Sequence, residues 1–460
     1  MDQFVRIGRR ASVIGIGAVE ALVVACGGTT DEVLSAPTVT LPGTTAAQAS
    51  PPPQTSTPIA AVVPTSEPTA TSLPPTEKPQ PTDEPSSTPE IIVTYANDAE
   101  RAVAEEINVR WGWETNFAER TIQLTELMTI LGRDPIIPID IPTFLPVANA
   151  PDYMKPREPV VSIVIDGDAR AYPLAMLMWH EIVNDTIGGV PVTVTFCPLC
   201  NTSITFERMV DGQELTFGTS GMLRRSDLVM WDHQSQSLWQ QITCNAIVGD
   251  FAANKTVLKQ LPSAIIAWET FAESYPEGKV LRRVTNSTGQ AIRQYDNPPY
   301  AGYDNVDSQP FLFLDPVDDR LAATSRVLTI DGEMPVAYPF SFLEETPVLN
   351  DSIDGEDIVA FFENGTFSAF LNRAFADQSV GSVTVFSRNV GDQTLTFELS
   401  DTGITDVETG SDWNLVGMAI GRELEGTQLE PVIHANHFWF AWAVFKPDTQ
   451  IRDSLDDLSG

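Results

Sequence analysis

Two cysteines stand three positions apart in the segment TFCPLCNTSITF, at Cys197 and Cys200. A Cys-x-x-Cys pair can act as a redox dithiol, supply two ligands to a metal ion, or form a small disulfide. In a thioredoxin-like dithiol, a helix begins at the cysteines, and its N-terminus lowers the thiol pKa. Here the residues after Cys200 alternate and are rich in β-forming types, so the sequence predicts a strand-turn-strand knuckle. This pattern favours a metal site, with the dithiol and the disulfide as open alternatives.

A tetrahedral metal site needs four ligands, and the chain has no second Cys-x-x-Cys and only four histidines. His180 lies in MLMWHEIVND, and His434 and His437 lie three positions apart in IHANHFWFAW, on one face if that stretch is helical. The alternative for each histidine is a hydrogen-bonded structural role. We expect a zinc, iron or copper ion to be bound by a set of four residues: Cys197, Cys200, His180 and His437.

A dense run of polar residues, FGTSGMLRRSDLVMWDHQSQSLW, follows the cysteines at positions 217 to 239. Its serine, aspartate and histidine could suggest a hydrolase, but the Gly-x-Ser-x-Gly elbow of such enzymes is absent from the sequence. We therefore expect these polar residues to surround the metal or line a cleft beside it. The full set of such candidates is Glu181, Ser220, Asp227, His233 and His434.

The charge of the chain excludes some classes of partner. The sequence of 460 residues has 62 acidic and 27 basic side chains, which gives a formal net charge of −35. Such a surface repels nucleic acid and anionic lipid headgroups, so we expect no nucleic-acid partner. No Gly-x-Gly-x-x-Gly or phosphate-binding loop is present, so no nucleotide cofactor is expected. The sequence does not name a protein or small-molecule partner.

The N-terminal residues have the layout of an export signal. Arg9 and Arg10 precede an apolar run that ends in Val-Val-Ala-Cys, and the cysteine is Cys26. This ending resembles a bacterial lipobox, in which that cysteine carries the lipid. The paired arginines allow twin-arginine export as well as the general secretory route. We expect an exported protein, anchored by lipid alone to the outer face of the cytoplasmic membrane or to the cell surface.

The rest of the chain divides by composition and by an internal repeat. One segment of the first half corresponds to one of the second: VVSIVIDGDARAYPLAMLMWHEIVND matches RVLTIDGEMPVAYPFSFLEETPVLND. Several later segments also correspond. The second copy has FENGTF where the first has its two cysteines. The expected segments are a signal peptide (1–26), a disordered Pro/Thr/Ser-rich stalk (27–92), a helical and extended lead-in (93–157), copy one (158–282), an insertion (283–324) and copy two (325–460).

Each copy alternates short apolar runs with turn signals such as Asp-Gly and Gly-Gly, and strands do not alternate with long helices. We therefore predict an α+β fold of predominantly antiparallel sheet, in tandem-duplicated β-rich lobes with a few short helices. Because the cysteines and three of the histidines are each found in one copy, a site in a cleft between the copies is expected.

Several long motifs of the chain together resemble one protein family. REPVVSIVIDGDARAYPLAMLMWHEIVNDTIGGVPVTVTFCPLCNTSITFERMVDG, FGTSGMLRRSDLVMWD and HFWFAWAVFKPDTQI are similar to the bacterial and archaeal family catalogued as domain of unknown function 3179. The resemblance covers about residues 130 to 455 and includes both cysteines. The chain departs from the family pattern at Asn201, where glycine is usual, at Arg225, where asparagine is common, and at Cys244, where glycine is common. The resemblance implies no particular reaction.

These observations support one leading hypothesis, a cell-surface lipoprotein whose Cys/His metal site serves redox chemistry or metal handling. Whether it is an enzyme is left open. One alternative is a non-enzymatic envelope module, for binding or structure, with a Cys197–Cys200 disulfide. The other alternative is a dithiol oxidoreductase.

Overall fold

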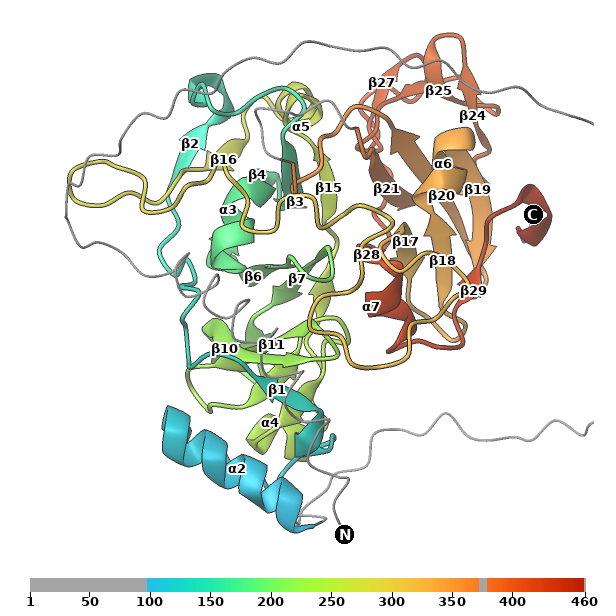
Figure 1. Ribbon diagram of the computed structural model, residues 1–460. Helices are drawn as coiled ribbons and strands as arrows, with labels where there is room; N and C mark the ends of the chain where they lie inside the picture. The colour runs from blue at the N-terminus through green and yellow to red at the C-terminus, as the bar shows by residue number, and fades with distance from the viewer. Residues whose placement is uncertain (1–96, 372–378, 459–460) are drawn as a thin grey trace, which may run out of the picture. The chain divides into compact units, whose positions relative to one another are not determined.

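The computed structural model describes residues 97–371 and 379–458, which form an α+β fold of mainly antiparallel sheets with short helices (Figure 1). The predicted signal peptide, Cys26, the predicted stalk and residues 93–96 of the lead-in lie outside the described residues. Among the residues that are described, no helix is both long and apolar enough to cross a membrane.

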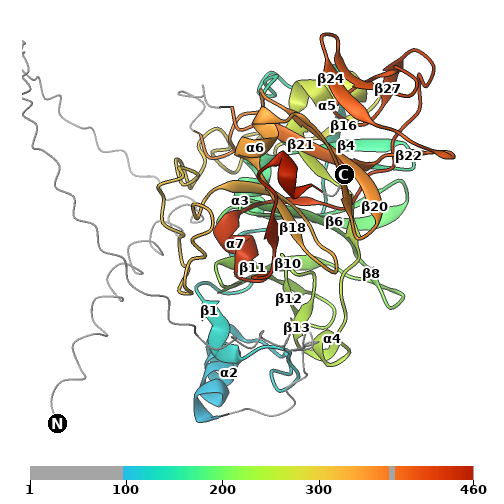
Figure 2. The same ribbon diagram turned by 90° about the vertical axis from the view of Figure 1, so that its right-hand side faces the viewer.

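The lead-in segment begins with the longest described helix. Its elements are α2 (Asp98–Trp111), η1 (Leu124–Glu126), β1 (Leu127–Thr129), β2 (Phe144–Pro146) and η2 (Val147–Asn149). The Asn97 side chain accepts a hydrogen bond from the Glu100 backbone at 3.0 Å, which caps the N-terminus of α2. Gly112, at φ 65°, ends the helix in the left-handed conformation. Figure 1 and Figure 2 both place α2 next to β1.

The first half of the remaining chain holds most of the candidate site residues. Its elements are β3 (Pro159–Ile165), β4 (Asp168–Pro173), α3 (Leu174–His180), β5 (Ile182–Ile187), β6 (Val190–Cys197), β7 (Thr202–Glu207), β8 (Met209–Val210), β9 (Gln213–Glu214), β10 (Phe217–Arg224), β11 (Asp227–Asp232), β12 (Leu238–Gln240), β13 (Ala246–Val248), α4 (Asp250–Ala253), β14 (Gln260–Leu261), β15 (Ala264–Ala267), α5 (Trp268–Ser274) and β16 (Lys279–Leu281).

The second half follows a parallel order. Its elements are β17 (Arg326–Ile330), β18 (Val336–Pro339), α6 (Phe340–Glu345), β19 (Val348–Ile353), β20 (Glu356–Glu363), β21 (Ser382–Ser387), β22 (Asn389–Val390), β23 (Gln393–Thr394), β24 (Phe397–Ser400), β25 (Gly403–Asp406), β26 (Asp412–Trp413), β27 (Ala419–Gly421), β28 (Ala435–Phe438), α7 (Trp439–Ala443), β29 (Gln450–Ile451) and η4 (Leu455–Asp457).

The sheets of the two halves correspond as well. The order β15-β3-β4-β16 in the first half matches β28-β17-β18-β29 in the second, and β10-β11-β12-β13 matches β24-β25-β26-β27. Named strands pair antiparallel, except that β16 runs parallel to β4 and β29 runs parallel to β18. The matching order of strands in the two halves supports the predicted tandem repeat. The repeat and its segment bounds remain predictions.

Buried polar side chains repeat between the halves at matching positions. The Tyr172 hydroxyl donates to Asp185 Oδ2 at 2.5 Å, and the Tyr338 hydroxyl donates to Asp351 Oδ2 at 2.6 Å. An arginine also pairs with each aspartate, although Arg170 lies on β4 and Arg452 follows β29. These contacts satisfy the two buried carboxylates, which gives both aspartates a role in the fold.

The hydrophobic core is shared by the two halves. One cluster of buried residues joins Val194 and Phe196 of the first half to Val327 and Phe438 of the second. Another joins Trp268 to residues such as Phe361 of the second half. Removing apolar surface from water contributes about 25 cal/mol per Å². The burial of these side chains between the two halves is therefore the main contribution to stability.

Two local expectations differ from the structure. His437 lies in strand β28, which pairs with β17, and His434 precedes that strand, so the two histidines do not share a helix face. The aromatic run FWFAW gave a helical pattern that applies only to the next element, α7. Cys244 lies in QQITCNAIVG, a stretch whose pattern predicts a strand, but the residue lies in the turn between β12 and β13 with φ 63°.

Candidate metal centre

The two cysteines lie on the turn between β6 and β7, as the strand-turn-strand pattern predicts. Cys197 is the last residue of β6, and the Cys200 backbone N–H donates to the Cys197 carbonyl at 3.2 Å. Asn201 closes the turn at φ 51°, a left-handed conformation that asparagine tolerates better than most residues. No helix begins at either cysteine, and both thiols are free and buried.

A second hairpin brings a carboxylate to the cysteines. The turn between β10 and β11 contains Arg225 at φ 54° and Ser226 at φ 70°, and β11 begins at Asp227. One ligand atom each from Cys197, Cys200 and Asp227 lies within 4.8 Å of the others. All three residues are 0–2% exposed, so the group is closed off from bulk solvent.

The hydrogen bonds of Asp227 leave one of its oxygens without a partner. Oδ2 accepts from Gln240 Nε2 at 2.6 Å and from the Ile242 backbone N–H at 3.0 Å. Oδ1 is buried and has no hydrogen-bond partner. A buried carboxylate oxygen that lacks a donor is costly, because its lost hydration is not replaced.

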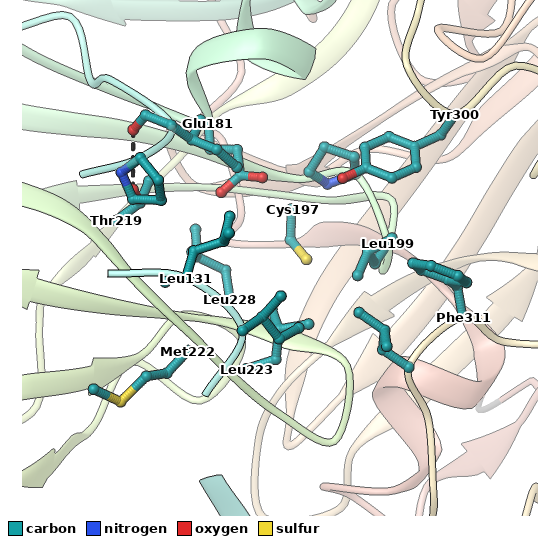
Figure 3. Close-up of a pocket in the computed structure, with 16 residues that line it drawn as sticks. Leu131, Glu181, Cys197, Leu199, Thr219, Met222, Leu223, Leu228, Tyr300 and Phe311 are labelled. Carbon is teal, nitrogen blue, oxygen red and sulfur yellow. Dashed lines mark hydrogen bonds between the residues drawn. The ribbon is translucent and has the colours of Figure 1, made fainter. Parts of the chain in front are cut away.

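Glu181 adds a second carboxylate at the end of α3. Its backbone adopts φ 58°, and the side chain is 8% exposed. Figure 3 shows this carboxylate directed into a pocket beside Cys197. Among the described residues, no arginine, lysine or histidine forms an ion pair with Glu181 or Asp227.

The buried surroundings raise the pKa values of the acidic side chains in this region. Burial, followed by the charge of Asp227, raises the pKa of Glu181 to about 8. Burial also raises the pKa of Asp227 to about 6, although its hydrogen bonds act in the opposite direction. The pKa of the Cys197 thiol is raised by burial, and that of Cys200 is raised well above its ordinary value. Four acidic groups therefore share one buried region, and neither of the two carboxylates has an ion-pair partner among the described residues.

The pocket next to Glu181 and Cys197 is a cavity of about 60 Å³ with mainly apolar walls (Figure 3). Tyr300 and Phe311, from the insertion between the two halves, lie on one side of it, and Leu131 lies on the other. The Thr219 hydroxyl reaches the wall but donates to the Ile136 carbonyl at 2.9 Å. The walls of this pocket come from segments far apart in the chain, so its shape could not be predicted from sequence spacing.

His180 and His437 lie outside the cysteine group. The two ring nitrogens of His180 contact the Ile137 carbonyl at 2.7 Å and the Tyr295 hydroxyl at 2.8 Å. His437 Nδ1 contacts the Thr202 hydroxyl at 2.7 Å, and its ring stacks on Trp442. In the described parts of the chain, no histidine nitrogen lies within 4.8 Å of the whole cysteine and aspartate set.

The other polar candidates have separate surroundings. The Ser220 hydroxyl donates to the Val229 carbonyl at 2.5 Å. His233 stacks on Trp231, and its Nε2 lies 3.8 Å from an Asp134 carboxylate oxygen. His434 Nδ1 contacts the Val432 carbonyl at 2.8 Å. Of the surrounding residues named from sequence, Asp227 thus joins the cysteines and Glu181 lies at the adjoining pocket.

The second half lacks the site at the matching position. The N–H of the residue before Cys197 donates to the Glu181 carbonyl at 2.8 Å, and the N–H before Glu363 donates to the Pro347 carbonyl at 2.8 Å. This correspondence places Glu363 where the first half has a cysteine and Pro347 where it has a glutamate. The backbone arrangement is therefore common to both halves, while the chemical groups belong to the first.

Comparison with known proteins identifies one family. The family model described as "Protein of unknown function (DUF3179)" matches residues 133–449, which include both cysteines, Glu181 and Asp227. No curated protein and no solved structure matches the chain.

Proposed function

The chain belongs to the DUF3179 family, whose function is unknown, and we propose that its Cys197, Cys200 and Asp227 bind one divalent metal ion. The bound ion would face the apolar pocket beside Glu181. The supporting observation is the buried Asp227 carboxylate, which lies in one 4.8 Å group with two thiols and whose Oδ1 has no hydrogen-bond partner. A cation would balance this oxygen and both thiolates at once.

The donor set favours zinc or ferrous iron over copper. Thiolates suit zinc, iron and copper(I), but a carboxylate is a hard ligand that copper(I) does not prefer. Zinc accepts cysteine and aspartate together, and three protein ligands with one open position are typical of catalytic zinc sites. We therefore propose zinc as the resident ion. Bound there, it would polarise an oxygen of a molecule in the pocket.

Glu181 is placed to act on the same molecule. Its carboxylate points into the pocket near Cys197, and it has no cation partner among the described residues. A carboxylate in such a position can accept or return a proton when a bound molecule reacts. The chain's own contribution is thus to hold the ion, to place Glu181 and to exclude bulk water.

The dithiol alternative is less consistent with the surroundings of the sulfurs. A reactive thiol needs a lowered pKa, which a helix N-terminus or a nearby cation provides. Here burial raises the pKa of both thiols, and the Ser226 carbonyl oxygen lies 3.4 Å from the Cys200 sulfur. A carbonyl oxygen near a free thiolate is repulsive, whereas it accepts a hydrogen bond from a protonated thiol.

We also propose that this protein is itself anchored to the membrane by a lipid, as the N-terminal sequence suggests. The proposed metal centre would then lie outside the cytoplasm. The residues that support this are Arg9, Arg10 and the cysteine at position 26. Fractionation of cells that express wild type or Cys26→Ser tests the proposal. The wild type should stay with the membrane, and the variant should leave it. Membrane retention of the variant would contradict the lipid anchor.

Metal analysis of full-length protein purified without a histidine tag tests the proposed metal site. We expect close to one zinc ion per chain for wild type and at least a tenfold loss for Cys200→Ser and Asp227→Asn. Cys244→Ser is the matched control, because Cys244 is a free cysteine outside the group. Wild type without zinc, or variants that keep it, would contradict the proposal.

A further inference from the structure

We infer that the pocket beside the proposed metal binds a small neutral molecule with a short apolar body and one hydroxyl or carbonyl group. The inference rests on the proposed metal site and adds the class of its ligand. It follows from the size of the cavity, from the chemistry of its walls and from the charge at its polar end.

The cavity sets the size of the molecule. Its volume is about 60 Å³. A cavity of roughly 150 Å³ binds benzene, so this smaller cavity accommodates a molecule smaller than benzene. A sugar, a nucleotide or a peptide is much larger than this, so the molecule has a short carbon chain or a small branched body.

The walls set its polarity. Aliphatic and aromatic residues form most of the lining, among them Leu131, Leu223 and Phe311. The polar side chains of Glu181 and Cys197 lie next to each other, and we call this part of the lining the polar end (Figure 3). The hydroxyl of Thr219 already donates to a backbone carbonyl, so it does not offer its proton to a ligand. An apolar body with a single polar group therefore matches this lining.

The charge at the polar end selects a neutral group. Two thiolates and one carboxylate carry three negative charges, and a divalent ion leaves one of them unbalanced. The Glu181 carboxylate faces the same end of the pocket. The unbalanced charge of the three ligands repels an anionic ligand such as a fatty acid, whereas a hydroxyl or carbonyl group carries no charge and can form a hydrogen bond with Glu181.

An outer cavity offers a route to the pocket. A space of about 340 Å³ is lined by Glu126, Arg225 and Asp315, and it shares Leu312 with the inner pocket. Leu312 has φ 55°, a conformation that is uncommon for leucine and is found where the surrounding structure enforces it. Leu312 belongs to the walls of both spaces, and we expect a ligand to pass it on the way from the outer cavity.

Absorption spectroscopy of the full chain loaded with Co²⁺ tests the inference, because ligand binding changes the visible bands of cobalt with thiolate ligands. 1-Butanol is within the expected size, 1-octanol is beyond it, and butyrate is an anion of similar size. We expect 1-butanol to cause a saturable change, with at least tenfold weaker effects of 1-octanol and butyrate. Leu131→Phe should weaken the 1-butanol response at least tenfold, and Ile141→Phe, at a position 88% exposed, is the matched control.

A second variant covers the case in which Leu131→Phe does not fold. Leu131→Ala enlarges the pocket, so it should strengthen the response to 1-octanol relative to 1-butanol. Bound cobalt that does not respond to 1-butanol, or that responds equally to butyrate, would overturn the inference and leave the metal site intact. Failure to bind cobalt would instead overturn the proposed metal site, and the inference with it.

Discussion

The Cys200 sulfur lies 3.4 Å from the backbone carbonyl oxygen of Ser226. The hydroxyl of the same serine donates to the Phe311 carbonyl at 2.6 Å, so one turn contacts both the cysteines and the wall of the pocket. This arrangement connects the proposed metal ligands to the insertion between the two halves. The backbone of Ser226 thus contacts the cysteines, and its side chain contacts the insertion.

Ser226→Ala separates these two roles. The variant removes the hydroxyl that donates to the Phe311 carbonyl and keeps the backbone carbonyl near the cysteines. We expect urea unfolding to show a stability loss of about 0.5–1.5 kcal/mol, the usual contribution of one hydrogen bond. The zinc content should not change. Thr288→Ala, which removes an exposed hydrogen bond, is the control. Loss of zinc from Ser226→Ala would show that the hydroxyl takes part in the metal site.

Metal binding should weaken steeply as the pH falls. Burial raises the pKa of both thiols, so zinc has to displace two protons from Cys197 and Cys200 near neutral pH. Each released proton changes the apparent association constant about tenfold per pH unit, so the affinity should fall about 100-fold per unit. Burial raises the pKa of Asp227 to about 6. Below that pH, zinc also has to displace a proton from Asp227, so the metal affinity should fall more steeply with pH. Competition with a chelator of known affinity at several pH values measures this slope.

The single-cysteine variant supplies the comparison for that titration. Cys200→Ser leaves one thiol to deprotonate, so its residual binding should change about tenfold per pH unit near neutrality. Wild-type binding that does not depend on pH would place the ion at other ligands, such as surface carboxylates that are already ionised.

Acid should destabilise the fold through its buried histidines. Burial lowers the pKa of His437 from its ordinary value of 6.5 to about 3. Between these pH values the unfolded chain binds a proton that the folded chain does not, so stability falls as the pH falls. At pH 5 this histidine alone should cost about 2 kcal/mol relative to neutral pH. His180, whose pKa burial lowers to about 4, acts in the same direction.

Urea unfolding of metal-free protein at pH 7 and pH 5 measures the effect. His437→Gln should reduce the stability difference between the two pH values by about 2 kcal/mol. Thr202→Val is the matched variant, because it removes the hydroxyl partner of His437 but keeps the titrating ring. It should lose stability at both pH values and keep a wild-type pH dependence. An unchanged pH dependence in His437→Gln would contradict this account of acid sensitivity.

The repeated tyrosine–aspartate contacts should contribute similarly in the two halves. Tyr172→Phe and Tyr338→Phe each remove a hydroxyl that donates to a buried aspartate. Hydrogen bonds to charged groups contribute about 1.5–3 kcal/mol, so both variants should lose stability in that range by chemical denaturation. Tyr153→Phe, in the lead-in segment, provides a comparison outside the repeat. A loss in one half with none in the other would contradict the equivalent roles of the two contacts.

The sequence predicted the local structure of the site better than its assembly. The alternation after Cys200 predicted the β6–β7 knuckle, because a strand-turn-strand pattern is set by neighbouring residues. Glu181 and Asp227 were named as surrounding residues, but their distance from the cysteines depends on how separate hairpins pack together. His180 was expected as a ligand, yet its ring contacts Tyr295, which is more than a hundred positions away in the sequence. Such a partner cannot be identified from spacing.

The second half shows why the histidine pair was harder to place. His434 and His437 precede an aromatic run whose spacing is helical, but backbone pairing with β17 extends this segment into a strand. Tertiary hydrogen bonds therefore override the local pattern. The fold class depended on many such segments at once, so the mainly antiparallel architecture could be predicted despite this local difference.

X-ray absorption at the zinc edge of untagged, zinc-loaded wild type tests the central claim most directly, because it reports the atoms bound to the ion. Binding by Cys197, Cys200 and Asp227 predicts two sulfur neighbours at about 2.3 Å and oxygen neighbours at about 2.0–2.2 Å. It also predicts no outer-shell scattering from imidazole. A spectrum with imidazole scattering, or with no sulfur neighbour, would contradict the claim.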